Sequence, residues 1–181
     1  QVSTNNVSPT GTYASAMGNG TTASGNESTA MGYDTTASGE ASTAMGYSTA
    51  ASAQSSTAMG KTTIASGINS TAMGRETTAS GDTSTGMGRS TTASGDDSTA
   101  MGNNTVASGY NSTAMGRETT ASGDTSTAMG RRTTARDYAS VVIGQYNSSG
   151  SSATSANSFS TSAPAFVIGN GTSGSLSDAF K

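Results

Sequence analysis

The chain has 181 residues, of which only 31% are hydrophobic and 5% aromatic, so it lacks the apolar material for a conventional globular core. Its formal net charge of −3 excludes the basic field that binds nucleic acid or an anionic membrane, and neither is expected as a partner of this segment. Cys and His are both absent, which excludes disulfides, thiolate metal sites, ordinary zinc sites and Ser/His/Asp catalysis. We therefore expect no enzyme and no cofactor.

A 14-residue repeat organises the sequence, with a unit close to x-S-T-A-M-G-x-x-T-T-A-S-G-x. A unit this short contains two five-residue runs, each closed by Gly and a polar pair. It predicts two short strands and two tight turns per coil of a parallel β-solenoid. All nine methionines share one register, which Ile143 continues: Met17, Met31, Met45, Met59, Met73, Met87, Met101, Met115, Met129 and Ile143.

The alternation of side chains along a strand gives each coil two kinds of face. In the first full unit Thr21 and Ala23 share one face, Ser28 and Ala30 share another, and Met31 lies opposite Ala30. The Ala23 position accepts no other residue in any unit, so we expect the Ala faces to pack inside a thin coil. The methionines would then form an outward apolar ladder, too long to remain in water, that copies of the chain bury in a closed symmetric oligomer.

The opposite arrangement remains open at this level. Methionine would then line the coil interior, alanine would face outward, and the coil would be a self-sufficient monomer.

Two variable polar pairs separate the strands of each unit. The pair after Ser-Gly collects Glu27, Glu40, Asp82, Asp96, Asp97 and Asp124. The pair after Met-Gly collects Tyr33, Tyr47, Lys61, Arg75, Arg89, Arg117, Arg131 and Arg132. One interpretation is a ligand-binding edge at which Tyr33, Tyr47, Arg75, Arg89, Arg117 and Arg131 contact a glycan or a host surface protein. The other is a solvated edge whose charges pair weakly with neighbouring subunits.

The repeat S-T-A-M-G-x-x-T-T-A-S-G, and above all Ser140-Val141-Val142-Ile143-Gly144, resembles the YadA-like head domains of trimeric autotransporter adhesins, whose repeats read approximately S-V-A-I-G-x-x-x-x-A-x-G. The resemblance covers residues 13–144, and residues 165–169 echo it. It implies an all-β, left-handed parallel β-roll, with three chains side by side in a homotrimer. It also implies a non-catalytic adhesin head that attaches to a host or environmental surface, outside the bacterial cell and anchored to the outer membrane through other parts of the protein.

Similar repeats occur in phage tail-fibre and bacterial surface proteins, so a structural or receptor-binding segment of a virion fibre is an alternative. A further alternative is an ice-binding solenoid, because threonines recur in two rows, from Thr21 to Thr133 and from Thr29 to Thr127. Threonine also simply suits strands and their ladders.

The sequence divides into three expected regions. Residues 1–12 form an N-terminal lead-in, and residues 13–144 form the repeat head. Residues 145–181 form a cap and trimer-locking segment that leads to a stalk or a next domain. The last region is set apart because Arg136 and Asp137 replace Ser and Gly, and because all three phenylalanines follow, as expected for the closed end of a solenoid.

Overall fold

The computed structural model describes residues 7–148 and 154–180, and these residues form strands, turns and loops without a helix. The chain forms two compact units, Gln1–Ser90 and Thr91–Lys181, and both are built from the same 14-residue coil. Within the described residues no helix is long and apolar enough to cross a membrane. The parallel β-solenoid predicted from the repeat is thus confirmed.

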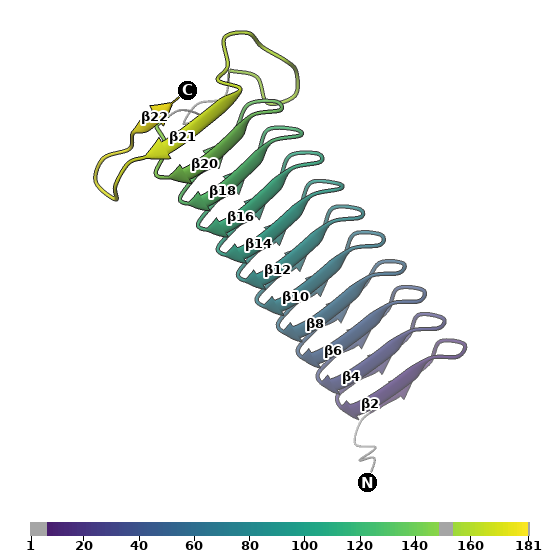
Figure 1. The fold of residues 1–181 in the computed structure, drawn as a ribbon. Helices are drawn as coiled ribbons and strands as arrows, with labels where there is room; N and C mark the ends of the chain where they lie inside the picture. The colour runs from purple at the N-terminus through teal and green to yellow at the C-terminus, as the bar shows by residue number, and fades with distance from the viewer. Residues whose placement is uncertain (1–6, 149–153, 181) are drawn as a thin grey trace. The chain divides into compact units, whose positions relative to one another are not determined.

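In the first unit every coil contributes one short and one five-residue strand (Figure 1). The short strands are β1 (Ser8–Pro9), β3 (Thr22–Ala23), β5 (Thr36–Ala37), β7 (Ala50–Ala51), β9 (Ile64–Ala65) and β11 (Thr78–Ala79). The long strands are β2 (Ser15–Asn19), β4 (Thr29–Tyr33), β6 (Thr43–Tyr47), β8 (Thr57–Lys61), β10 (Thr71–Arg75) and β12 (Thr85–Arg89). Each strand pairs in parallel with its copy in the next coil, so identical positions stack, as in Met31 on Met45.

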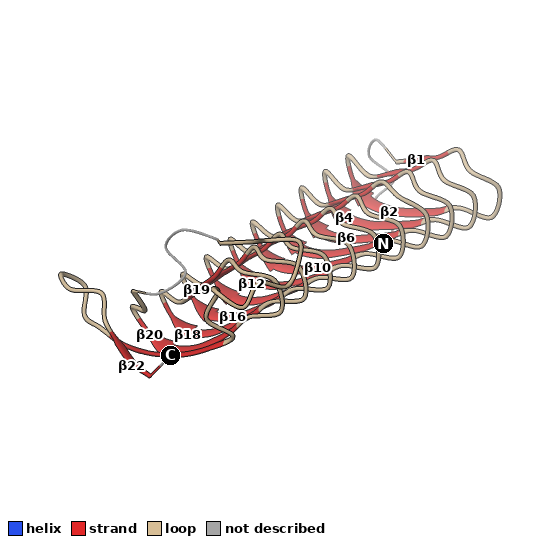
Figure 2. Cartoon of the chain, turned by 90° about the horizontal axis from the view of Figure 1, so that it is seen from above, coloured by secondary structure: helices blue, strands red, loops and turns tan. Residues whose placement is uncertain are grey.

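The second unit repeats this pattern. Its short strands are β13 (Thr92–Ala93), β15 (Val106–Ala107), β17 (Thr120–Ala121) and β19 (Thr134–Ala135). Its long strands are β14 (Thr99–Asn103), β16 (Thr113–Arg117), β18 (Thr127–Arg131), β20 (Val141–Gln145) and β21 (Phe166–Asn170), and the antiparallel strand β22 (Asp178–Phe180) follows. Figure 2 shows the long and short strands of successive coils joined by turns.

The interior of each coil is filled by small side chains. The Ala columns, represented by Ala23 and Ala30, have no exposed surface, and the inward Thr21 and Ser28 are equally buried. The expectation that alanine faces inward is confirmed, and the alternative with methionine in the coil interior is wrong. Only small side chains fit because two strands of the same coil face each other across a single layer of side chains.

The strands differ in length from the two five-residue runs of the repeat. The T-T-A-S-G run forms a strand of only two residues, and the long strand begins one residue late, at Thr29 rather than Ser28. The Ser28 hydroxyl instead donates to the Gly25 carbonyl at 2.6 Å and stabilises the turn. From the second coil onward two non-glycine residues per coil also adopt positive φ, such as Glu27 (57°) and Asp34 (53°), because the chain must reverse twice within 14 residues.

The glycine after each methionine is required by the stacking of coils. Gly60 has φ +124°, and a Cβ built on it would lie 2.0 Å from the carbonyl oxygen of Gly74 in the next coil. No side chain fits there, because the neighbour is backbone that the ladder holds in place. The close approach of successive coils therefore explains the glycine of the Met-Gly pair.

The exposed edge of the first short strand is closed by proline. In β1 the N–H groups of Ser8 and Thr10 donate to the carbonyls of Thr21 and Ala23, both at 2.9 Å. Pro9 lies between them, at the position whose N–H would point away from the next coil. Its missing N–H therefore costs no ladder bond, and the ring removes a donor from the open edge.

The other end of the short-strand ladder, in the second unit, is closed by a side-chain amide. Asn147 Oδ1 accepts the N–H of Thr134 at 2.8 Å, and its Nδ2 donates to the Thr134 carbonyl at 3.1 Å. This amide replaces the backbone of a further coil. Asp137, which is buried, accepts the N–H groups of Thr154 and Ser155 with Oδ1 and fixes the segment that leads into β21.

Candidate functional site

The outward face of the long strands carries the methionine ladder. In the first unit Met17 is 48% exposed, and the methionines of the following coils are half-buried because each covers its neighbour. In the second unit Met101, Met115 and Met129 form a column of the same kind, and Ile143 and Ile168 end it. The side chains lie on the outer face, as predicted, and the assignment of this ladder to a trimer interface stays a prediction.

The neighbouring outward column becomes more apolar toward the end of the second unit. It holds Thr113 and Thr127, then Val141, then Phe166. Phe166 and Phe180 face each other with ring centroids 6.0 Å apart, and they are 40% and 58% exposed. The apolar outward face is thus broadest at β20 to β22.

One of the two threonine rows does not face solvent. Thr21 and its counterparts in later coils are buried, with at most 1% of their surface exposed, so this row cannot present an ice-binding face. The hypothesis that this row presents a face to solvent is wrong, because Thr21 lies immediately before β3 and is buried like Ala23. The row from Thr29 to Thr127 is half-buried beside the methionines.

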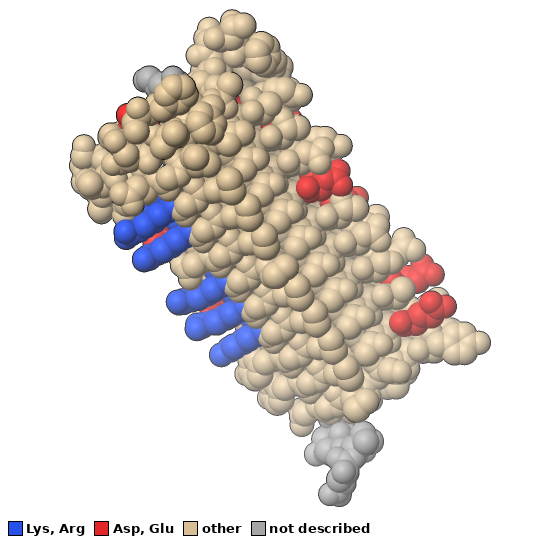
Figure 3. Space-filling view, viewed as in Figure 1, with Lys and Arg blue, Asp and Glu red and all other residues tan. Residues whose placement is uncertain are grey.

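The last residue of each long strand forms one edge of each unit, and the basic side chains gather there (Figure 3). In the first unit this edge column consists of Tyr33, Tyr47, Lys61, Arg75 and Arg89, which are paired in register from coil to coil. The rings of Tyr33 and Tyr47 stack with centroids 5.1 Å apart and 8° between their planes. Lys61 Nζ lies 5.6 Å from the centre of the Tyr47 ring, so aromatic and cationic groups form one continuous column.

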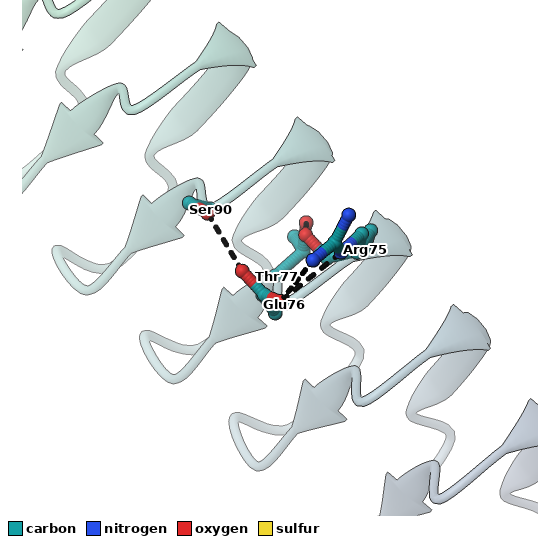
Figure 4. Close-up of polar contacts among 4 residues, drawn as sticks. All are labelled: Arg75, Glu76, Thr77 and Ser90. Carbon is teal, nitrogen blue, oxygen red and sulfur yellow. Dashed lines mark hydrogen bonds and ion pairs between the residues drawn. The ribbon is translucent and has the colours of Figure 1, made fainter.

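An acidic residue lies directly beside this column. Glu76 Oε1 accepts from Arg75 Nε at 3.0 Å, and Glu76 Oε2 accepts from the Ser90 hydroxyl at 3.1 Å (Figure 4). The hydrogen bond from Arg75, followed by the one from Ser90, holds the pKa of the Glu76 carboxyl below its ordinary value. The sequence signal for this contact is the adjacent pair Arg75-Glu76, at the end of a strand and the start of a turn.

The second unit has a related edge with different contacts. Glu118 binds both Arg117, at 3.1 Å, and Arg132 of the next coil. The hydrogen bond from Arg132 lowers the pKa of Glu118 and raises the pKa of Arg132. Arg131 and Arg132 both lie over the buried Tyr146 ring, at 5.3 and 5.5 Å from its centre. Of the predicted ligand-facing residues, Tyr33, Tyr47, Arg75 and Arg89 thus share one column, and Arg117 and Arg131 lie on the edge of this unit.

The carboxylates after Ser-Gly occupy the opposite edge, and at two positions they serve the turn. Asp82 Oδ1 accepts the N–H of Ile68 at 2.9 Å, and Asp124 Oδ1 accepts the N–H of Tyr110 at 3.0 Å. Each bond joins one coil to the next. Asp at this position therefore contributes to coil stacking, a role the sequence interpretation missed because it read the column only as charge.

Within residues 7–148 and 154–180 no group of three His, Cys, Asp or Glu side chains is placed to hold a metal ion. Two surfaces in each unit are the candidate functional features of the described residues, the apolar outward face and the edge that follows Met-Gly.

The comparison with protein families gives one match. The family model for the YadA head domain repeat matches residues 10–35, 37–63, 51–77, 65–91, 79–105, 93–119, 107–133 and 121–147. These stretches cover most of the chain, and from residue 37 onward successive matches are offset by one coil. Among curated proteins, no match was found.

Proposed function

The chain belongs to the YadA head domain family, whose heads are trimeric bacterial surface adhesins. We propose that the chain is the head segment of such an adhesin, lies outside the cell, and attaches the cell to a host or environmental surface. The observation that carries the proposal is the pair of surfaces on each coil, one apolar and one polar. The first suits assembly, and the second suits recognition.

Assembly would use the methionine ladder. Each coil adds one half-buried methionine to the outward face, and the column ends in Ile143 and Ile168. An apolar column of this kind loses contact with water when three copies pack side by side, and a cyclic oligomer closes without leaving a free copy of the face. Methionine is flexible, so the interface tolerates small differences between coils.

Residues 145–181 would act as the cap of the roll. Asn147 closes the short-strand ladder, and Ser148 is held by Asp178 through two hydrogen bonds, 2.9 Å from its N–H and 2.7 Å from its hydroxyl. Termination of the ladder protects its edge from pairing with other chains. The broad apolar face at Phe166 and Phe180 adds surface for locking three chains together.

The molar mass in solution tests the assembly. We expect a trimer by light scattering, and Met45→Glu with Met73→Glu should give monomers, because a charge in each of two coils cannot be buried without a partner. Thr36→Glu is the matched control, since Thr36 is exposed on the short-strand face. A monomeric native protein, or a double variant that stays trimeric, contradicts the interface.

Attachment is tested separately. Beads coated with the trimer should adhere to cultured cells or to immobilised matrix protein more strongly than beads coated with albumin. Absence of adhesion on every surface contradicts the adhesin assignment, whatever the molar mass.

A further inference from the structure

The edge column of the first unit, Tyr33, Tyr47, Lys61, Arg75 and Arg89, combines two chemistries in one line. We propose that this column binds a linear anionic polysaccharide, one that carries carboxylate or sulfate groups along its length. The inference rests on the proposed attachment function and names the class of ligand for it.

The column is accessible and continuous. Tyr33 and Tyr47 are 51% and 50% exposed, and the three basic side chains that follow are exposed as well. Register places them one coil apart, about 4.8 Å from residue to residue. A polymer lying along the column would meet a new side chain at every coil.

The placement of the cations favours an external anion. Lys61, Arg75 and Arg89 occupy directly opposite positions in successive strands, and like charges at such positions repel. Their spacing is shorter than the distance over which physiological salt screens charge, about 8 Å. In the described residues Glu76 pairs with Arg75, whereas Lys61 and Arg89 form no ion pair. A polyanion would relieve this repulsion at both ends of the triplet.

Arg75 is already oriented for recognition. Glu76 holds its guanidinium from one side and is itself held by the hydroxyl of Ser90, as Figure 4 shows. A guanidinium fixed in this way retains further N–H donors for a carboxylate or a sulfate, and it loses little freedom on binding. The tyrosines contribute phenolic hydroxyls and ring edges at the neighbouring coils, which suit the hydroxyl and C–H groups of sugars.

Two other polyanions fit less well. Nucleic acid is bound by stacking bases on open aromatic faces, but here the facing sides of Tyr33 and Tyr47 cover each other and Lys61 lies over the Tyr47 ring. A folded acidic protein needs a patch of roughly 800 Å² on each partner, and the column is one side chain wide. A linear polymer of sugars matches the width.

The experiment measures binding of the trimer to immobilised heparin, polygalacturonate, neutral dextran and poly-L-glutamate, at two salt concentrations. We expect binding to heparin or polygalacturonate that weakens with salt, and none to dextran. Polygalacturonate carries carboxylates alone and heparin carries both groups, so binding to polygalacturonate shows that carboxylate suffices, and binding to heparin alone shows that sulfate is needed. Lys61→Gln with Arg89→Gln should weaken binding at least about tenfold. Tyr33→Leu with Tyr47→Leu should weaken it about threefold or more without changing the salt dependence.

The matched control is Arg132→Gln with Arg136→Gln, which removes the same charge from the second unit, and circular dichroism verifies the fold of every variant. The inference is overturned if neither polysaccharide binds, if the control loses as much affinity as the column variants, or if poly-L-glutamate binds equally well. Adhesion of coated beads separates the two proposals. If beads coated with the wild-type protein adhere, and beads coated with the column variants adhere equally well, the ligand assignment alone is overturned. If beads coated with the wild-type protein never adhere, the adhesin function is overturned.

Discussion

Replacement of Thr63 by valine tests how the interior of the coil is built. Thr63 is fully buried on the short-strand side of its coil, and its hydroxyl has no hydrogen-bond partner. Valine has the same shape and exchanges the hydroxyl for a methyl group. The substitution therefore removes a buried polar group without opening a cavity, and the β-branched residue remains compatible with a strand.

The expected gain follows from the cost of the unpaired hydroxyl. A buried donor or acceptor without a partner costs about 1–3 kcal/mol, so Thr63→Val should raise the free energy of unfolding by about 1–2 kcal/mol. In a chain of this size that corresponds to an increase in Tm of about 2–8 °C. Few core substitutions are predicted to stabilise a protein, so the sign of the change in the free energy of unfolding is informative.

The next coil provides the matched control. Its Gly86 leaves space that the Thr77 methyl occupies, so a Cβ built on Gly86 would lie 2.9 Å from that methyl carbon. The Thr77 hydroxyl then donates to the Gly88 carbonyl at 3.2 Å. Thr77→Val removes this bond and should be neutral or destabilising by up to about 1 kcal/mol.

Thermal and urea unfolding, followed by far-UV circular dichroism at one protein concentration, compare the two variants. Equal shifts for Thr63→Val and Thr77→Val, or a loss of stability in Thr63→Val alone, would refute the reasoning. Light scattering verifies that both variants keep the native molar mass.

Three further predictions concern the turns and the edge charges. Gly60→Ala should lower stability by more than about 3 kcal/mol, because its methyl would meet backbone of the next coil, and unchanged urea unfolding would contradict this. Thr125→Asn should raise stability by about 0.5–1 kcal/mol, since Thr125 has φ 56° and Asn tolerates that region better, whereas Thr127→Asn in strand β18 should show no gain. The pKa of Glu118 is lower in the folded than in the unfolded state, so its contact with Arg132 stabilises the fold above the unfolded pKa, and this stability is lost as pH falls through the folded pKa. Glu118→Gln should therefore flatten the decrease of Tm on acidification. An unchanged pH profile argues against the contact with Arg132.

The period of the sequence was sufficient to predict the coil. A residue type that returns at every fourteenth position stacks on itself in a parallel solenoid, so the Met and Ala columns could be derived before any coordinates. The restriction of the Ala23 position to alanine favoured an inward direction for Ala23 and an outward one for Met31, but the opposite arrangement stayed open until the structure showed Ala23 buried.

The turns and contacts between side chains could not be derived in this way. Pattern does not reveal that the T-T-A-S-G run forms a strand of two residues, because strand length depends on where the backbone must reverse to meet the next coil. Nor does it reveal that Asp82 bonds the N–H of Ile68, or that Glu76 binds Arg75 and Ser90. These contacts depend on side-chain rotamers in three dimensions.

The sequence by itself thus determined the repeating coil, its stacked columns of identical residues and the separation of alanine and methionine onto opposite faces, because the period and the alternation of side chains can be read from the chain directly. Only the tertiary structure decided that alanine rather than methionine fills the coil, and that the rings of Tyr33 and Tyr47 stack with Lys61 over the Tyr47 ring. Both depend on the orientation that each turn gives to its side chains, and that orientation is fixed by the packing of one coil on the next.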